Sequence, residues 1–301
     1  MTAIGNTPLI RLTRLPGPND AEIWVKWEGA NPTGSMKDRM ALSMIVAAER
    51  SGKLKPGGKV VEYTGGSTGS SLAMVCATKG YRAHFVSSDA FAESKLATMR
   101  AFGAEVEVFP SVNRMITKEL IQSMLNRVDE LAKEPNTFRT DQFNNPDNRS
   151  AYHAMAKEMV RDLGGAPDEF ITGVGTGGSF SGAAEVLQPM GTRCIPIEPA
   201  NSRALSKQGD LGGHRLEGMG AGFVPSITRL DLAAEIIAVT DHDAEESARR
   251  LAREEGIFGG ISSGSNVWAA LQRAKQLGEG HRIVTVIVDS GLKYLEGSLF
   301  R

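Results

Sequence analysis

The chain has 301 residues, of which 41% are hydrophobic and 23% are charged, and its formal net charge at pH 7 is −1. A chain of this length can bury two cores of ordinary domain size, and its near-neutral charge gives no reason to expect nucleic acid or an anionic membrane as a partner. No apolar run reaches the roughly 18 residues of a membrane span, and the first residues lack a signal-like core. These features predict a cytoplasmic protein.

Short apolar runs alternate with longer helical patterns along the whole chain. In chain order, strands are predicted at 21–27, 59–63, 82–88, 105–109, 169–173, 194–198, 235–239 and 282–288. Helices are predicted between them, at 36–51, 71–80, 93–102, 116–132, 149–163, 180–190, 244–255 and 265–277. This alternation predicts an α/β protein with twisted, mainly parallel sheets flanked by helices.

One lysine, Lys37, lies in the segment NPTGSMKDR, after a turn of small residues and before an apolar helical pattern. An amine with an unperturbed pKa near ~10.4 is mostly protonated at neutral pH. A nucleophilic lysine must therefore be desolvated, placed near positive charge or bound as an imine. Two interpretations are open here: a nucleophile, or a solvated residue of a first helical turn.

Two glycine-rich segments, TGGSTG at 64–69 and GVGTGGS at 173–179, each follow a strand pattern and precede a helical one. A strand that delivers glycines to a helix N-terminus leaves unpaired backbone N–H groups directed at one spot, and the helix dipole adds positive potential there. Each segment is therefore predicted to bind a phosphate or a carboxylate.

The second glycine segment has three interpretations. It can be a plain tight turn, or a dinucleotide fingerprint in which Gly173, Gly175 and Gly178 fit G-x-G-x-x-G and Glu198 holds a ribose. It can also be a phosphate cup for a cofactor whose other end is held by Lys37. No Walker lysine follows the glycines, which argues against a nucleotide triphosphatase.

Eight motifs together make the third interpretation specific. In chain order they are IGNTPLIRL, NPTGSMKDR, TGGSTG, DQFNNPDN, GVGTGGS, EGMGAGFVP, GISSG and VDSGLKYL. With these motifs the chain resembles, nearly end to end, the pyridoxal-phosphate enzymes of the cysteine synthase and cystathionine β-synthase family, also called fold type II. The resemblance implies pyridoxal 5'-phosphate as the cofactor and an amino acid as the small-molecule substrate.

The resemblance also implies roles for residues that contact the cofactor. Lys37 would bind it covalently and later move the substrate Cα proton, and Ser262 would face the pyridine nitrogen. A hydroxyl there cannot readily keep that nitrogen protonated, so the ring is a weaker electron sink, which suits expulsion of a β-leaving group. The residues that would hold the phosphate are Gly175, Thr176, Gly177, Gly178 and Ser179.

The TGGSTG segment departs from the usual family wording TSGNTG. Gly65 stands where the family has a serine for the substrate carboxylate, and Ser67 stands where an asparagine contacts the cofactor's ring oxygen. Ser67 can still donate one hydrogen bond, whereas Gly65 offers only backbone. The resemblance assigns Thr64, Thr68 and Gln142 to the carboxylate. The change at Gly65 predicts a loop that lies closer to the substrate or admits a larger one, and leaves the amino-acid donor open.

The family further implies two domains: a smaller, substrate-carboxylate-binding one at 36–140 and a larger, cofactor-binding one formed by 1–35 and 141–301. The cofactor would lie in the cleft between them, the smaller domain would close over the substrate, and the protein would be a homodimer.

The leading functional hypothesis is β-replacement on an O-activated L-serine, with O-acetylserine and sulfide giving cysteine. A β-elimination lyase, or a synthase that uses another donor or nucleophile, is the nearest alternative. From other classes, a non-catalytic binding protein and a nicotinamide dehydrogenase remain, the latter supported only by the glycine fingerprint and Glu198.

The remaining reactive side chains add no chemistry. Cys76 and Cys194 lie in apolar contexts and are predicted to pack in the cores. The five histidines show no ligand spacing, so no metal site is predicted.

Overall fold

The computed structural model describes residues 1–113, 115, 117–209 and 211–301. The chain divides into two units with their own cores. The smaller unit consists of Met1 and Lys37–Asn148, and the larger unit consists of Thr2–Met36 and Arg149–Arg301. The sequence analysis places the smaller domain at 36–140, whereas the chain passes between the two units of the structure at 36/37 and at 148/149.

The smaller unit contains a four-stranded parallel sheet with the strand order β5-β4-β3-β6. Its strands are β3 (Lys59–Tyr63), β4 (Arg82–Ser88), β5 (Glu105–Phe109) and β6 (Thr137–Arg139). Its helices are α1 (Lys37–Arg50), α2 (Ser67–Lys79), α3 (Glu93–Ala101) and α4 (Lys118–Leu131). The short helix α5 (Pro146–Ser150) spans the crossing to the larger unit.

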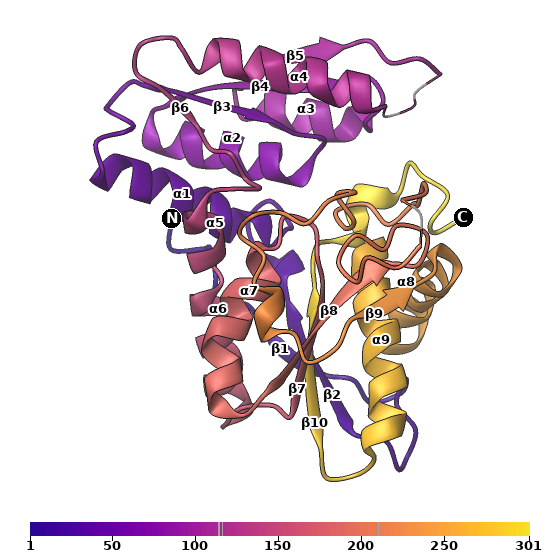
Figure 1. The fold of residues 1–301 in the computed structure, drawn as a ribbon. Helices are drawn as coiled ribbons and strands as arrows, with labels where there is room; N and C mark the ends of the chain where they lie inside the picture. The colour runs from indigo at the N-terminus through magenta and orange to yellow at the C-terminus, as the bar shows by residue number, and fades with distance from the viewer. Residues whose placement is uncertain (114, 116, 210) are drawn as a thin grey trace. The chain divides into compact units, whose positions relative to one another are not determined.

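A hydrophobic cluster joins α4 to the sheet of this unit, where α4 lies along β3 and β4 (Figure 1). The cluster contains Val61, Val86, Met124, Val128 and Leu131. The α4 residues recur at helical spacing, so one stripe of an otherwise polar helix is buried. The hydroxyl of Thr117 caps the helix by accepting from the Leu120 N–H. Ile116, the predicted first residue of this helix, lies outside the described residues.

The larger unit contains a six-stranded sheet with the order β1-β2-β10-β7-β8-β9, in which only the pairing of β1 with β2 is antiparallel. Its strands are β1 (Leu9–Arg11), β2 (Glu22–Trp27), β7 (Glu169–Gly173), β8 (Arg193–Pro199), β9 (Ile237–Val239) and β10 (Arg282–Ile287). Its helices are α6 (His153–Leu163), α7 (Gly178–Leu187), α8 (Asp241–Glu255) and α9 (Ile261–Leu277). Single 3₁₀ turns occur at Glu28–Ala30, Gln188–Met190, Leu230–Leu232 and Gly291–Tyr294.

Helices cover both faces of the larger sheet, with α6 and α7 on one face and α8 and α9 on the other (Figure 1). The five neighbouring strands β2, β10, β7, β8 and β9 run parallel, so their carboxyl ends lie at one edge of the sheet. In α/β proteins, loops at that edge carry the ligand sites. The predicted class of mainly parallel sheets flanked by helices is confirmed.

The structure differs from the sequence prediction at short elements. The helix predicted at 149–163 is two helices, α5 and α6, with Tyr152 buried between them. The strands β1 and β6 were not predicted, because three residues are too few to show an alternating pattern. Both depend on pairing with a longer neighbour, which local sequence does not encode.

Cys76 and Cys194 each have 1% of their surface exposed, so the prediction that both pack in the cores is confirmed. Burial raises the pKa of each thiol to about 12. Among the described residues, no helix is both long and apolar enough to cross a lipid bilayer.

A fully buried amide on α9, that of Asn266, ties together two neighbouring strands of the larger unit. Its Oδ1 accepts a hydrogen bond of 2.8 Å from the Gly173 N–H, and its Nδ2 donates one of 2.8 Å to the Val286 carbonyl. Gly173 is the last residue of β7, directly before the second glycine loop. Asn266 therefore holds the point at which that loop leaves the sheet.

Replacing Asn266 by alanine leaves two buried backbone groups unpaired, at roughly 1–3 kcal/mol each. We expect Asn266→Ala to lower the free energy of unfolding by roughly 2–5 kcal/mol in urea titrations. Gln272→Ala, on the same helix but half-buried, is the control and should change it by less than about 1 kcal/mol. Equal losses in both variants would contradict this role for the amide.

Candidate active site

The residues predicted for the site fall into two groups, one in each unit, and each group is described within its own unit. The smaller unit carries Lys37, Thr64, Gly65, Ser67, Thr68 and Gln142. The larger unit carries Gly175, Thr176, Gly177, Gly178, Ser179 and Ser262.

In the larger unit, the loop between β7 and α7 presents a row of backbone donors at the start of a helix. The N–H groups of Gly175, Gly177, Gly178 and Ser179 have no acceptor among the described residues. Gly177 is the N-cap of α7 and has a φ of 86°, a conformation that favours glycine. Unpaired N–H groups and the positive end of the helix dipole together form an anion site.

Close packing explains why this loop is rich in glycine. A Cβ at Gly175 would lie 2.1 Å from the carbonyl oxygen of Gly218, and one at Gly177 would lie 2.1 Å from the hydroxyl oxygen of Thr228. The covering segment is also hydrogen-bonded to the loop, because the Gly220 N–H donates to the Val174 carbonyl at 2.9 Å. The EGMGAGFVP motif thus has a structural task, which is to hold the anion loop from one side.

Thr228 is a residue that the sequence analysis missed. Its hydroxyl is buried against Gly177 and has no hydrogen-bond partner among the residues that the structure describes. Buried hydroxyls are usually paired, so an unpaired one beside an anion loop marks a place where a ligand or a water supplies the partner. No signal in the sequence could have identified it, since Thr228 lies outside the glycine motif that it contacts.

The structure distinguishes the two serines of GISSG at the start of α9. The Ser263 hydroxyl oxygen accepts a 3.0 Å hydrogen bond from the Val288 N–H, so it has a structural task. The hydroxyl of Ser262, which is 3% exposed, makes no hydrogen bond with any described residue. Of the two serines, Ser262 is therefore the one whose hydroxyl no described residue binds; its contact with the pyridine nitrogen stays a prediction.

The chain just before Lys37 is held by backbone pairing. The Met36 N–H donates to the Val288 carbonyl and the Ser290 N–H donates to the Gly34 carbonyl, both at 2.9 Å. Lys37 follows as the first residue of α1 and is 8% exposed. The chain up to Met36 is thus fixed within the larger unit, and the burial of Lys37 is unusual for a lysine.

In the smaller unit, Thr64 shapes the TGGSTG loop. Its hydroxyl oxygen accepts from the N–H groups of Gly66 at 3.2 Å and Gly69 at 3.0 Å. The N–H groups of Gly65 and Thr68 have no acceptor among the described residues. Thr64 therefore organises the loop, while the neighbouring N–H groups at the start of α2 remain available to a carboxylate.

Thr68 and Gln142, which are 74 positions apart in the chain, lie in direct contact. The Thr68 hydroxyl donates to Gln142 Oε1 at 2.8 Å, and Gln142 Nε2 donates to the Tyr63 carbonyl at 3.1 Å. The structure thus brings together two of the predicted substrate residues on one polar patch. Ser67 is the first residue of α2, beside them in the chain.

Glu62 is a second residue that the sequence analysis missed, and its side chain is hydrogen-bonded to this patch. One of its carboxylate oxygens accepts from the Thr140 hydroxyl at 2.5 Å and from the Gln142 N–H at 3.1 Å. Burial raises the pKa of Glu62 to about 7, although these hydrogen bonds and the charge of Arg139 oppose the shift and Asp141 adds to it. A charged residue inside the buried strand KVVEY is the signal that could have identified it.

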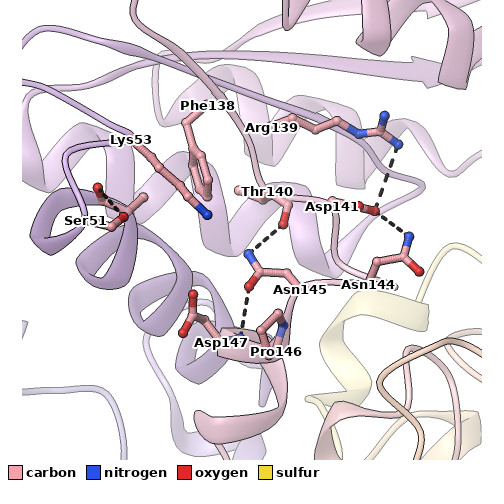
Figure 2. Close-up of a pocket in the computed structure, with 11 residues that line it drawn as sticks. Ser51, Lys53, Phe138, Arg139, Thr140, Asp141, Asn144, Asn145, Pro146 and Asp147 are labelled. Carbon is pink, nitrogen blue, oxygen red and sulfur yellow. Dashed lines mark hydrogen bonds and ion pairs between the residues drawn. The ribbon is translucent and has the colours of Figure 1, made fainter.

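A cavity of about 210 Å³ lies elsewhere in the smaller unit, beside the chain that follows β6 (Figure 2). Its lining includes Lys53, the Phe138 ring, Asn145 and Asp147. None of the predicted site residues lines it, so the cavity is separate from the groups predicted to bind the carboxylate, although its lining includes Thr140, which donates to Glu62. Within the described ranges, no cluster of three or more histidine, cysteine, aspartate or glutamate side chains could hold a metal ion.

Comparison with known proteins identifies the family. The pattern of the family described as pyridoxal-phosphate dependent enzyme matches residues 1–289. The chain belongs to this family. A cysteine synthase of Staphylococcus aureus is 40% identical over 301 residues, which cover 99% of this chain and 95% of the relative.

Solved structures agree with this assignment. A hydrogen sulfide-producing enzyme from Fusobacterium nucleatum matches with a TM-score of 0.91 and 40% identity, covering 98% of this chain and 96% of that one. An O-ureido-L-serine synthase matches with a TM-score of 0.92 and 36% identity, covering 99% of this chain and 93% of that one. The resemblance to the cysteine synthase group of pyridoxal-phosphate enzymes is confirmed.

The larger unit fits this cofactor on structural grounds. Pyridoxal phosphate needs a cradle for a dianion and a polar partner for its ring nitrogen. The N–H groups of the β7–α7 loop that have no acceptor among the described residues can form the phosphate cradle. The Ser262 hydroxyl, which no described residue binds, can be the partner of the ring nitrogen. Both loops lie at the carboxyl edge of the same parallel sheet.

The cradle can be tested with a matched pair of glycines. We expect Gly177→Ala to lower the affinity for pyridoxal phosphate by about tenfold or more, because the new Cβ would strain a φ of 86° and meet Thr228. Gly191→Ala is the control, since Gly191 has a φ of 94° but nothing within 4 Å of its Cβ position. Cofactor retention during dialysis, followed by absorbance, measures both; equal retention would contradict the role of the loop.

The titration of Glu62 gives a stability prediction. Its folded pKa of about 7 exceeds its ordinary value of 4.5, so Glu62 stabilises the folded state most below pH 4.5, and this contribution is lost as the pH rises toward 7. Relative to Glu62→Gln, the wild type should therefore lose roughly 3 kcal/mol of unfolding free energy over that range.

Urea titrations at several pH values measure this difference. Glu105→Gln, at an exposed position, is the control and should follow the wild type. Parallel profiles of the wild type and Glu62→Gln would mean that the carboxyl titrates at an ordinary pKa.

Proposed function

We propose that the protein catalyses β-replacement on an O-activated L-serine, most simply the conversion of O-acetylserine and sulfide to cysteine. The observation that carries the proposal is the pair of unsatisfied donor sets, one suited to a phosphate and one suited to a carboxylate, in a chain that is 40% identical to a cysteine synthase. Pyridoxal phosphate, when bound, supplies a ring that withdraws electrons from the substrate Cα.

The larger unit would hold the cofactor. Backbone N–H groups from Gly175 to Ser179 would bind its phosphate, with the hydroxyls of Thr176 and Ser179 beside them. Ser262 would donate to or accept from the ring nitrogen without placing a charge there. A ring whose nitrogen is not kept protonated withdraws electrons less strongly than one whose nitrogen is. A neutral hydroxyl at this position therefore favours loss of a β-leaving group over long-lived carbanion chemistry.

The smaller unit would hold the amino-acid donor by its carboxylate. The N–H groups of Gly65 and Thr68 and the side-chain amide of Gln142 would be its donors, beside the start of α2, where the helix dipole favours a negative charge. Thr64 and Glu62 would keep these groups in place through the hydrogen bonds they already make. Ser67 would contact the cofactor's ring oxygen.

Lys37 would hold the cofactor through its amine and, once the donor has displaced it, take the proton from the donor's Cα. Its low exposure supports this role, because desolvation favours the neutral, proton-accepting amine. With the chain before it held by Val288 and Ser290, the amine would start from a fixed backbone position.

A second candidate is a related enzyme that uses another donor or nucleophile, or a lyase that eliminates without replacement. Two observations favour keeping it: the glycine at position 65, and structural neighbours named as an O-ureido-L-serine synthase and a hydrogen sulfide-producing enzyme. Product analysis distinguishes the candidates, since replacement consumes the added nucleophile and elimination does not.

The homodimeric state remains a prediction from the family resemblance, and the cytoplasmic location remains a prediction from the sequence.

The test is cysteine formation from O-acetylserine and sulfide by the purified protein loaded with pyridoxal phosphate. We expect Lys37→Ala to lower kcat by about 10³-fold or more, because it removes both the cofactor anchor and the proton acceptor. Lys53→Ala, an exposed lysine on the separate cavity, is the control and should keep wild-type activity. If the wild type turns over no faster than Lys37→Ala, the proposed reaction is wrong.

A further inference from the structure

Three side chains at four-residue spacing cover the glycines of the TGGSTG loop. They come from the segment that leads into α3 and from α3 itself. A Cβ added to each glycine would lie within 3 Å of its covering side chain: Phe91 over Gly65, Lys95 over Gly66 and Met99 over Gly69. The glycine content of the loop thus follows in part from the helix packed above it.

At Gly65 the covering side chain is an aromatic ring. A Cβ there would lie 2.4 Å from Cε1 of Phe91 and 2.7 Å from both Cδ1 and Cζ. Gly65 is not in the left-handed region, so its backbone would accept another residue. The Phe91 ring, rather than the backbone, is therefore what excludes a side chain at position 65.

The ring cannot easily move away. Phe91 packs against the hydrophobic cluster of the smaller unit that contains Val61 and Val86. Its own N–H donates to the Ser88 carbonyl at 3.1 Å, which holds the turn before α3. Moving the ring would open a gap in that cluster, at the usual cost of lost packing.

This geometry changes the expectation from the sequence. The replacement of a serine by Gly65 predicted a loop that lies closer to the substrate or admits a larger one. The structure shows instead that an aromatic ring occupies the space which a side chain at 65 would take. Where the family wording has a serine hydroxyl, this chain therefore presents the apolar ring of Phe91.

We propose that Phe91 is a specificity-determining residue, whose ring stands in for the missing side chain at position 65 and limits the size of the amino-acid donor. The inference rests on the proposed function, because it takes the TGGSTG loop as the donor site. Phe91 and Gly65 are both only partly buried, so a small molecule can reach their contact. Donors with a compact, uncharged β-substituent fit beside an apolar ring, since a larger group would have to displace it.

The steric part of the proposal is tested by a double-mutant cycle in stability, which needs no activity. Gly65→Ser should lower the urea midpoint of unfolding, because the new side chain collides with the ring. In Gly65→Ser/Phe91→Ala the same serine should cost nothing, so the two changes should be non-additive. Additive effects would overturn the claim that the ring excludes a side chain at 65.

The specificity part is tested with sulfide and two uncharged donors that differ in size, O-acetyl-L-serine and O-butanoyl-L-serine. Phe91→Ala should raise the ratio of kcat/KM for the larger donor to that for the smaller one by about tenfold or more. Phe109→Ala is the matched control, because Phe109 packs against the same cluster but does not cover Gly65. Its ratio should stay at the wild-type value.

The outcomes separate this inference from the proposed function. A wild type that turns over O-acetyl-L-serine, with a ratio that Phe91→Ala leaves unchanged, would overturn the inference alone. A wild type that turns over neither donor would overturn the proposed function. In that case the ratio of the two dissociation constants, read from the absorbance of the bound cofactor, decides on Phe91 in the same way.

Discussion

Backbone N–H groups left unpaired at the starts of α2 and α7 are the constraint on which the two halves of the site depend. A helix cannot satisfy its first N–H groups internally, and each of these helices starts at the carboxyl end of a parallel strand. Among the described residues, four N–H groups of the β7–α7 loop and the start of α7 have no acceptor, and two N–H groups of the TGGSTG loop, those of Gly65 and Thr68, have none. Both anions of the proposed reaction, the cofactor phosphate and the donor carboxylate, would thus meet the same kind of backbone site.

Each glycine loop is also covered by a second segment, and the two covers have different consequences. In the larger unit, Gly218 and Thr228 press on the loop where it turns, which keeps its N–H groups directed at one point. In the smaller unit, Phe91 presses on Gly65 where the donor would bind. The first cover therefore acts on the loop proposed to hold the phosphate, whereas the second acts at a position where this chain departs from the family wording.

Buried polar side chains then hold the loops to their sheets. Asn266 fixes the point where the β7–α7 loop begins, Ser263 fixes the chain at Val288, and Glu62 fixes Gln142. Each acts on backbone groups that water cannot reach, so each is costly to remove. Glu62 differs from the other two because its charge changes near neutral pH, which links the order of the carboxylate patch to the acidity of the solution.

The sequence by itself determined the fold class, the family, and the positions of Lys37 and of both glycine loops. These follow from local patterns, because hydrophobic periodicity sets the elements and a strand that meets a helix through glycines exposes its N–H groups wherever the chain then goes. Only the tertiary structure decided that the Ser263 hydroxyl binds the Val288 N–H, that Thr68 meets Gln142, and that Phe91 fills the space beside Gly65. Each of these depends on a contact between segments distant in the chain. The local sequence around a residue does not specify which distant side chain will pack against it.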